Sequence, residues 1–316
     1  MVIDTTVQEK NITFPTDTKL RMKVIRRCWK CAKDEKLCLR RSYQREIKKL
    51  LRIIRFGRSR KDSRKVSAAI RRVKTIANAL LRDISRKLPA TRQEEMKEEL
   101  SLWSKAVNQH QKDKEKVYSL HEPEVSCICK GKEHKKYEFG SKAAVAMTKR
   151  SGIIVGAKSY KGNPYDGNTL EEVLQQIQEV RGKEAIRAFC DRGFRGRKQI
   201  ASTIIEIPDN GHVKATGYQR QQARKNFGRR SAIEPIIGHL KSDFLLSRNY
   251  LKGAIGDTRN LLLSATAFNL QKWMRVQAHL LLYFYLSVFQ RILASKTTQT
   301  SFPSKNSLHN DLLVWC

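Results

Sequence analysis

The sequence predicts an α/β fold, in which a mixed sheet of about five strands is flanked by helices and a long all-helical insert follows the first strand. Two observations lead to this prediction. Short β-branched or apolar segments, typical of strands, occur at the start of the chain and again after residue 117. Between them, over residues 17–116, apolar side chains recur with helical spacing and almost nothing favours a strand.

The chain opens with a predicted strand, and residues 1–16 are assigned to it and to the turn that follows. The segment Val2–Val7 is apolar and β-branched, and Pro15 ends the extended stretch. Thr16 or Asp17 is a suitable N-cap for the next helix, because a side-chain oxygen there can accept a hydrogen bond from the first turn.

Residues 17–116 predict a basic insert of roughly four helices. Apolar side chains recur at intervals of three and four, and arginine and lysine occupy the positions expected on the outer faces of packed helices. Gly57 and Pro89 interrupt this pattern. Thr91 together with Glu94 predicts a capping box at the start of the next helix.

Residues 117–290 predict the rest of the α/β domain. The strand candidates are Val117–Leu120, Tyr137–Met147, Gly152–Ser159, Ala185–Cys190 and Thr203–Ile207, and the helix candidates are Thr169–Val180, Asn226–Ser242 and Thr258–Leu293. The most apolar run, Leu280–Phe289, is too short to span a bilayer, so we expect a buried helix there. The end of the chain is polar and patternless, so we expect a disordered tail over residues 291–316.

The composition indicates a polyanionic partner. Lysine and arginine number 64 against 30 acidic residues, which gives a formal net charge of +34 spread along the chain. A globular protein this basic repels itself unless it meets a polyanion, and nucleic acid is the usual one. A ribosomal-type protein or a membrane-surface protein is the alternative on charge alone.

The N-terminus and the cysteines favour a cytoplasmic protein without a membrane partner. No basic segment followed by a long apolar stretch opens the chain, and the seven cysteines cannot all pair with one another. Two cysteine groups have spacings worth testing as zinc sites: Cys28, Cys31 and Cys38, and the pair Cys127 and Cys129. Structural zinc usually needs four ligands, so we expect free thiols instead.

Asp191 is the strongest candidate for a catalytic carboxylate. It follows the apolar strand 185–190 and precedes a glycine-rich turn, and ligands bind beyond the carboxyl ends of strands in open α/β sheets. Metal-dependent phosphoryl transfer on DNA uses two ions about 4 Å apart, held by a few carboxylates on rigid elements. The alternative is a turn aspartate before glycine.

Two further carboxylates are candidates for the same site. Asp4 lies within the apolar strand Val2–Val7, where a charge is costly unless it is paired or bound to a metal; the alternative is an exposed residue of a frayed edge strand. Glu234 is spaced to lie on one side of a helix with Phe227, Arg230 and Lys241. Such a face suits a phosphate backbone, although charged helix faces are usually only solvated.

These motifs together resemble those of insertion-sequence DDE transposases. The pattern Phe227-x2-Arg230-x3-Glu234-x6-Lys241 is similar to their Y-x2-R-x3-E-x6-K signature, with phenylalanine in place of tyrosine. CDRGFRG at 190–196 resembles their second-aspartate motif, and IDTTVQEKNIT at 3–13 resembles their first-aspartate strand. The segments HEPEV, GNPYDGNTL and GHLKSDFLLSRNYLKG extend the likeness to about Arg275.

The resemblance implies an RNase-H-like fold and a metal-dependent DNA transposase that cleaves and joins strands at insertion-sequence ends. Asp4, Asp191 and Glu234 would be the catalytic triad and hold two divalent ions, expected to be Mg²⁺. Arg230 and Lys241 would contact DNA, and we add Arg229 and Arg195 from the same motifs to this DNA-binding set. The implied partners are double-stranded DNA, at transposon ends and target, and further copies of the chain in a DNA complex.

Other interpretations remain open at this point. The family normally carries an N-terminal helical domain that recognises the transposon end, so we expect a truncated copy. A truncated, non-catalytic DNA-binding remnant that interferes with full-length transposase is the main alternative, and a general metal-dependent nuclease is another. Asp166 competes with Asp4 as first ligand, but Asp-Gly after Asn-Pro favours a turn. His121, Glu122 and Glu124 near Pro123 could assist the site, and a solvated loop explains them equally well.

Overall fold

The computed structural model describes residues 1–298 apart from residues 58, 111, 130–135, 209–215 and 229. The chain forms two compact units, Met1–Phe268 and Asn269–Cys316. The first unit contains a mixed sheet and two groups of helices, and the described part of the second unit is the continuation of one long helix.

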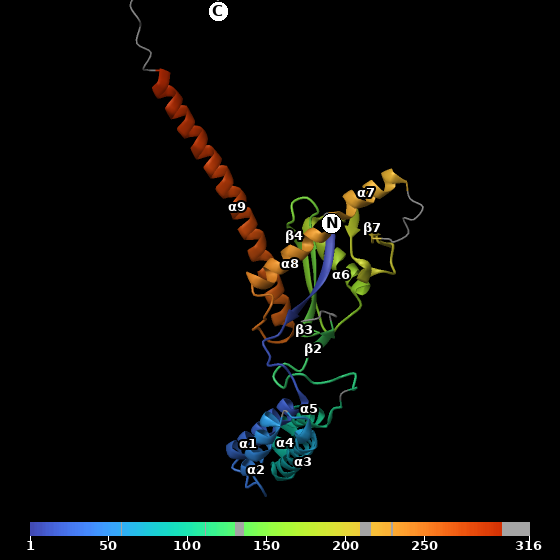
Figure 1. Cartoon of the computed structure of the whole chain (residues 1–316), viewed down its shortest axis with the longest axis vertical. Helices are drawn as coiled ribbons and strands as arrows, with labels where there is room; N and C mark the ends of the chain where they lie inside the picture. Colours follow the sequence, from blue (N-terminus) through green and yellow to red (C-terminus); the bar gives the residue numbers. More distant parts are fainter. Residues whose placement is uncertain (58, 111, 130–135, 209–215, 229, 299–316) are drawn as a thin grey trace, which may run out of the picture. The chain divides into compact units, whose positions relative to one another are not determined.

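The sheet has seven strands in the order β2-β3-β1-β5-β7-β6, and β4 also pairs with β3 (Figure 1). The strands are β1 (Val2–Glu9), β2 (Ser126–Cys129), β3 (Tyr137–Met147), β4 (Ile154–Tyr160), β5 (Arg187–Phe189), β6 (Gln199–Ile200) and β7 (Thr203–Glu206). β1 runs antiparallel to β3 and parallel to β5, which in turn runs parallel to β7. This mixed sheet flanked by helices confirms the predicted α/β fold of the RNase-H-like kind, with seven strands instead of about five.

The predicted strand Val117–Leu120 is wrong, for a visible reason. The Gln109 side chain satisfies the backbone of this segment: its amide nitrogen donates to the Val117 carbonyl at 3.1 Å, and its oxygen accepts from the Val117 N–H at 2.9 Å. A buried amide therefore replaces the neighbouring strand that the apolar pattern suggested. β2 and β6 were not predicted, because strands of four and two residues are too short to show a period.

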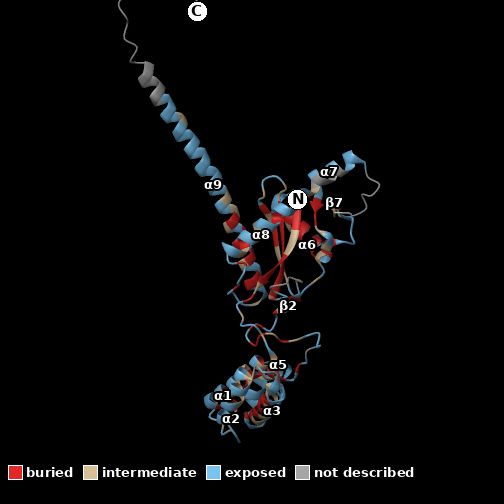
Figure 2. Ribbon diagram, viewed as in Figure 1, coloured by how far each residue is buried: buried red, intermediate tan, exposed pale blue. Residues whose placement is uncertain are grey.

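Five helices form the insert: α1 (Asp17–Asp34), α2 (Gln44–Phe56), α3 (Ser63–Lys87), α4 (Ala90–Glu95) and α5 (Lys97–Asn108). They enclose an apolar core of their own, which includes Ile25, Val73, Leu80 and Trp103 (Figure 2). Thr16 caps α1 as predicted, by accepting from the Lys19 N–H. The capping box is wrong, because Pro89 is the N-cap of α4 and Thr91 already lies inside its first turn.

Helices cover both faces of the sheet. α6 (Asp166–Arg181) packs Leu170, Val173 and Ile177 against β1, β3 and β5 on one face. On the other face, α8 (Ile233–Ser242) and the start of α9 (Gly253–Thr298) pack against β3 and β4. The candidate site described below lies on the α8 face.

The predicted helix Asn226–Ser242 is broken in the structure. α7 (Gly217–Gly228) ends at its glycine, residues Arg230–Ala232 form a short 3-10 turn, and α8 starts at Ile233. Pro235 in the first turn of α8 explains the break, because proline has no N–H to donate and its ring clashes with the carbonyl of residue 231 in a continuous helix. The four signature residues therefore occupy three elements instead of one helix face.

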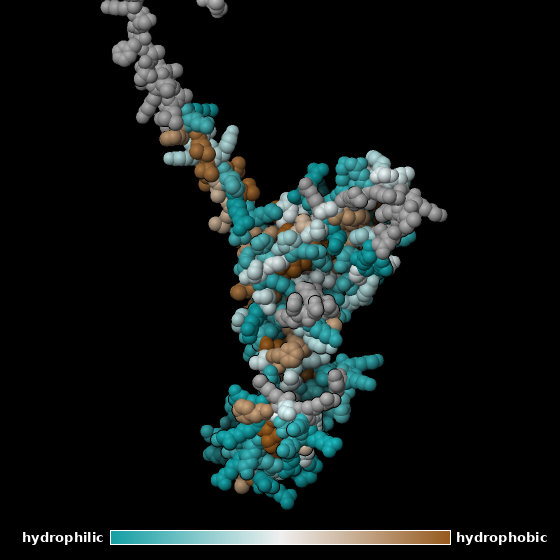
Figure 3. Space-filling view, in the orientation of Figure 1, coloured by the Kyte–Doolittle hydropathy of each residue, from teal (hydrophilic) through white to brown (hydrophobic). Residues whose placement is uncertain are grey.

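The long helix α9 departs from two predictions. Leu280–Phe289 is helical, as expected, but its large apolar side chains are exposed and the predicted burial is wrong. Figure 3 shows apolar side chains on the visible face of this helix. The helix continues through Thr298, within the segment 291–316 where a disordered tail was expected, and residues 299–316 lie outside the described part. Among the described helices, none has the length and apolarity to cross a membrane.

Candidate active site

The strand register brings Asp4 and Asp191 together. β1 and β5 are parallel neighbours with Val2 opposite Phe189. Asp4 and Asp191 each lie two residues further along, and residues two apart in an extended chain point to the same face. Asp191 has an extended backbone just beyond the end of β5, with φ −84° and ψ −177°. The two predicted aspartates therefore lie on adjacent chains and on one face of the sheet.

The thiol of Cys190 is a second indicator of this proximity. Cys190 is fully buried, and burial raises its pKa to about 12, with the negative charges of Asp191 and Asp4 acting in the same direction. The positive charge of Arg230 opposes this rise in pKa. The charges of Asp4, Asp191 and Arg230 all act on the pKa of the Cys190 thiol.

An apolar cluster anchors α8 beside the aspartates. Ile233, the first residue of α8, is buried together with Val2, Phe189 and Met147. Val2 and Phe189 each lie two residues before an aspartate, Asp4 and Asp191. Packing of Ile233 against Val2 and Phe189 therefore places the start of α8 next to the two aspartates. Glu234 follows Ile233, its side chain is 63% exposed, and its Oε1 lies 3.7 Å from Arg230 Nη2.

Phe227 packs against the same cluster. Its ring fills the position where the signature has the ring of a tyrosine. Its ring meets Phe189 edge-on, with 5.8 Å between ring centroids. Lys149, which was not predicted, places its Nζ 3.9 Å from the centroid of the Phe189 ring. The edge of the sheet near Asp191 therefore carries two cationic side chains, Lys149 and Arg230, suited to a phosphate backbone.

The backbone next to each aspartate orients its carboxylate. Asp4 Oδ1 accepts from the Thr5 N–H at 2.7 Å, and Asp191 Oδ1 accepts from the Gly193 N–H at 2.8 Å. A Cβ at Gly193 would lie 3.0 Å from that Asp191 oxygen and 2.9 Å from Asp166 Oδ2. A side chain at 193 would therefore displace both carboxylates, which glycine leaves in place.

The donor set suits a hard divalent cation. Asp4, Asp191 and Glu234 offer only carboxylate oxygens, which Mg²⁺ prefers. In the described part of the chain, no group of three or more His, Cys, Asp or Glu side chains lies close enough to hold a metal ion. The sheet thus fixes the positions of Asp4 and Asp191, while the exposed Glu234 side chain does not form a cluster with them.

Asp166, considered from the sequence as a metal ligand or a turn residue, lies in a partly buried hydrogen-bond network. It is the first residue of α6, and its Oδ1 accepts from Thr5 Oγ1 at 2.8 Å and from Lys142 Nζ at 2.8 Å. Lys142 is buried and also donates to the Pro164 carbonyl at 2.6 Å. This network was missed, although a single lysine within the apolar stretch of β3 was the signal that could have found it.

The remaining predicted DNA-binding residues are placed as follows. Lys241 lies on α8 with its Nζ 3.8 Å from Glu138 Oε1, at the opposite end of that helix from Glu234. Arg195 is exposed, and its carbonyl accepts from the Tyr165 hydroxyl at 2.8 Å. Arg229 lies outside the described residues.

The other sequence-based candidates do not form sites. Cys28 and Cys31 are buried in the insert core, and none of the six described cysteines forms a disulfide. A solvated loop, one of the two alternatives for residues 121–124, does not describe Glu122, which is buried and lies 3.4 Å from the buried Lys10 ammonium. Asp257 completes this ion pair cluster at 2.7 Å from Lys10.

Comparison with known proteins identifies the family of the chain. The family described as Transposase DDE domain matches residues 104–270. The matched segment contains Asp191 and Glu234 but not Asp4, which lies on β1 before it. No curated protein and no solved structure matches the chain at a significant level. The family match covers more than half of the chain, which therefore belongs to the Transposase DDE domain family.

Proposed function

We propose that this protein is an insertion-sequence transposase that uses Asp4, Asp191 and Glu234 for metal-dependent DNA cleavage and strand transfer. The observation that carries the proposal is the parallel register of β1 and β5, which brings Asp4 and Asp191 to one face beside α8. Membership of the family supplies the class of reaction, DNA transposition.

Each carboxylate has a distinct structural position in this proposal. Asp4 and Asp191 are held by the sheet and by backbone N–H groups, so they form the fixed half of the site. Glu234 lies at the start of α8 and would complete the ligand set by turning its exposed side chain toward them. When bound, two divalent ions such as Mg²⁺ would activate the attacking hydroxyl and neutralise charge on the phosphate.

The cationic side chains near this edge would hold the DNA. Arg230 is 25% exposed at its side chain and close to Cys190 and Glu234, so it can reach a phosphate next to the carboxylates. Arginine suits this work because its planar guanidinium can make two parallel hydrogen bonds to one phosphate. Lys149 on Phe189 adds a second positive charge at the same place.

Two substitutions separate catalysis from binding. Asp191→Ala should abolish Mg²⁺-dependent nicking of supercoiled plasmid while leaving duplex retention nearly unchanged, because a metal ligand acts mainly on the transition state. Arg230→Ala should instead weaken retention and reduce its salt dependence by about 0.9 in log–log slope, the value for one phosphate contact.

The outcome also decides between the two proposed roles of the chain. Nicking by the Asp191→Ala variant at the parent rate would show that Asp191 is only a turn residue. A parent chain that retains duplex DNA but never nicks it would instead support the non-catalytic DNA-binding remnant. Circular dichroism of both variants verifies that neither change acts by unfolding.

A further inference from the structure

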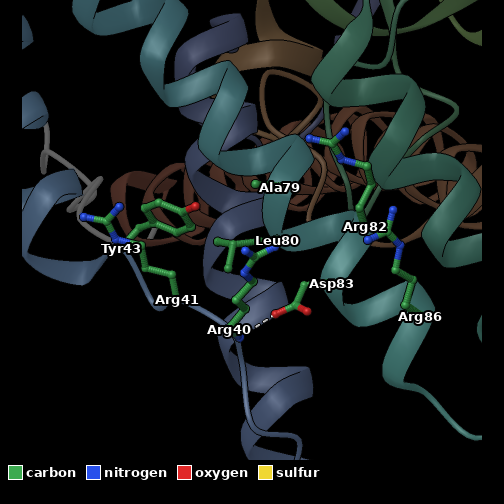
Figure 4. Close-up of a pocket in the computed structure, with 8 residues that line it drawn as sticks. All are labelled: Arg40, Arg41, Tyr43, Ala79, Leu80, Arg82, Asp83 and Arg86. Carbon is green, nitrogen blue, oxygen red and sulfur yellow. Dashed lines mark hydrogen bonds between the residues drawn. The ribbon is translucent and has the colours of Figure 1, made fainter.

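Four arginines line one cavity of the helical insert, away from the candidate carboxylate site in the fold. The cavity has a volume of about 470 Å³ and is lined by Arg40, Arg41, Arg82 and Arg86, with Tyr43, Ala79, Leu80 and Asp83 (Figure 4). Arg82 and Arg86 lie one turn apart on α3, while Arg40 and Arg41 lie in the segment between α1 and α2. All four arginines are exposed.

The one acidic residue of this cavity, Asp83, can offset only one of its four arginine charges. Asp83 Oδ2 accepts from the backbone N–H of Arg40 at 2.7 Å, and its Oδ1 lies 3.0 Å from Lys87 Nζ. These contacts fix the segment before α2 against α3. The guanidinium groups of the cavity therefore keep a net positive charge, which a bound anion would balance.

Two of the four arginines, Arg41 and Arg82, have local contacts within the insert. Tyr43 has a left-handed backbone with φ 57°, and its ring lies below the guanidinium carbon of Arg41 at 5.1 Å. Arg82 Nε donates to the Asn78 carbonyl at 3.3 Å on its own helix. Such contacts reduce the rotamer freedom that long side chains lose on binding.

A second cavity of the same insert has a different charge balance. That cavity, of about 650 Å³, is lined by Arg27, Lys30 and Arg92 but also by Asp34, Glu35, Glu95 and Glu99. Arg27 pairs with Glu99 at 2.8 Å, and Arg92 pairs with Glu35 at 2.7 Å. Its basic residues are thus already balanced by acids. A third cavity of the insert, of about 660 Å³, is lined by Arg71, Lys74 and Arg82 without an acidic residue, so the unbalanced positive charge continues beyond the first cavity.

We propose that the Arg40–Arg41–Arg82–Arg86 cavity binds phosphate groups of the duplex DNA backbone, as a contact surface separate from the carboxylate site. Guanidinium groups from two elements suit two or more phosphates of one strand, and they carry no information about base sequence. The proposal rests on the proposed function insofar as it takes duplex DNA as the substrate. It assigns to the insert the role of holding DNA while the sheet carries out the chemistry.

The test compares two double variants of the full chain that remove the same charge. Arg41→Gln/Arg86→Gln removes two arginines of the cavity, whereas Arg27→Gln/Arg92→Gln removes two arginines that are already ion-paired. Affinity for duplex DNA of arbitrary sequence is measured over a range of salt concentrations. Losing two phosphate contacts should reduce the log–log salt slope by about 1.8 and lower the affinity at low salt by roughly ten-fold, while the control stays near the parent.

Further arms keep the result decisive. Arg41→Lys/Arg86→Lys retains the charge and should recover most of the slope, which a general folding defect would not allow. Equal slopes for the cavity variant and the paired-arginine control, with DNA binding by the parent, would overturn the inference and leave the proposed function standing. Failure of the parent to bind duplex DNA would overturn both. Loss of binding to free mononucleotide alone, with unchanged duplex affinity, would overturn the duplex assignment.

Discussion

At the scale of single residues, the candidate site depends on how the chain restrains two carboxylates. Asp4 is held by the next N–H along its strand, whereas Asp191 is held by the N–H of Gly193, two residues away in a tight turn. The sequence predicted both aspartates from their position at an apolar strand. It did not show that Gly193 lies between Asp191 and Asp166, because that contact joins residues distant in the chain.

The first prediction concerns Gly193. In Gly193→Ala the new methyl group would lie 2.9 Å from Asp166 Oδ2 and 3.0 Å from Asp191 Oδ1, so both carboxylates must shift from their present positions. We expect Mg²⁺-dependent nicking to fall at least ten-fold with little loss of DNA retention. Gly238→Ala on α8 is the matched control, since a Cβ there meets nothing within 4 Å. Equal nicking rates for the two variants would contradict this account of the turn.

The second prediction concerns the thiol of Cys190. Its pKa is raised from 9.0 to about 12 by burial and by Asp191 and Asp4, so at pH 9 the folded protein keeps it as the neutral thiol. Alkylation with iodoacetamide at this pH should therefore modify the exposed Cys38 and Cys129 much faster than Cys190, as read by peptide mass spectrometry. In denaturant the three cysteines should react alike. Rapid labelling of Cys190 in the folded chain would show that the strand end is open.

At the scale of elements, the Thr5–Asp166–Lys142 network connects the three parts that flank the site. Thr5 belongs to β1, Lys142 to β3 and Asp166 to the start of α6. This network lies on the α6 side of β1, because Thr5 follows the parity of Ile3, which packs against α6. The network therefore braces β1, the strand that carries Asp4, from the α6 side of the sheet.

The third prediction tests this supporting role. Asp166→Asn leaves the Lys142 ammonium, whose side chain is 9% exposed, without its carboxylate, and should lower the free energy of unfolding by about 2 kcal/mol. Glu171→Gln, which breaks the exposed pair with Arg197, should cost less than about 0.5 kcal/mol. Urea unfolding followed by circular dichroism measures both. The double variant Asp166→Asn/Lys142→Met should recover part of the lost stability, because it removes the buried ammonium that Asp166→Asn leaves unpaired. A double variant no more stable than Asp166→Asn would contradict the supporting role.

Element boundaries show what the sequence could and could not predict. The strand–insert–sheet order was confirmed, because apolar periods of two and of three to four residues are local properties of the chain. The continuous helix through Glu234 was wrong, because Pro235 and Gly228 break it where the four-residue signature suggested one face. The strand at 117–120 was wrong because its partner is the Gln109 side chain, which no local pattern reveals.

At the scale of the whole molecule, the positive charge is distributed over surfaces with different surroundings. The net charge of +34 predicted a polyanionic partner but not where that partner binds. The structure distinguishes arginines already paired with acids, such as Arg92, from the unbalanced group around the insert cavity. It also shows an insert with its own apolar core, which composition alone could not distinguish from an extension of the sheet domain.

The central claim is that Glu234 joins Asp4 and Asp191 in one metal-dependent site. The most direct measurement is Mg²⁺-dependent nicking by Glu234→Gln, which keeps the shape of the side chain and removes the charge needed to hold a divalent ion. Glu179→Gln, at an exposed position near the end of α6, is the control with the same chemical change. The account predicts that Glu234→Gln loses nicking by a hundred-fold or more while folding and duplex retention remain at the parent level. Nicking by Glu234→Gln at the rate of the Glu179→Gln control would contradict it.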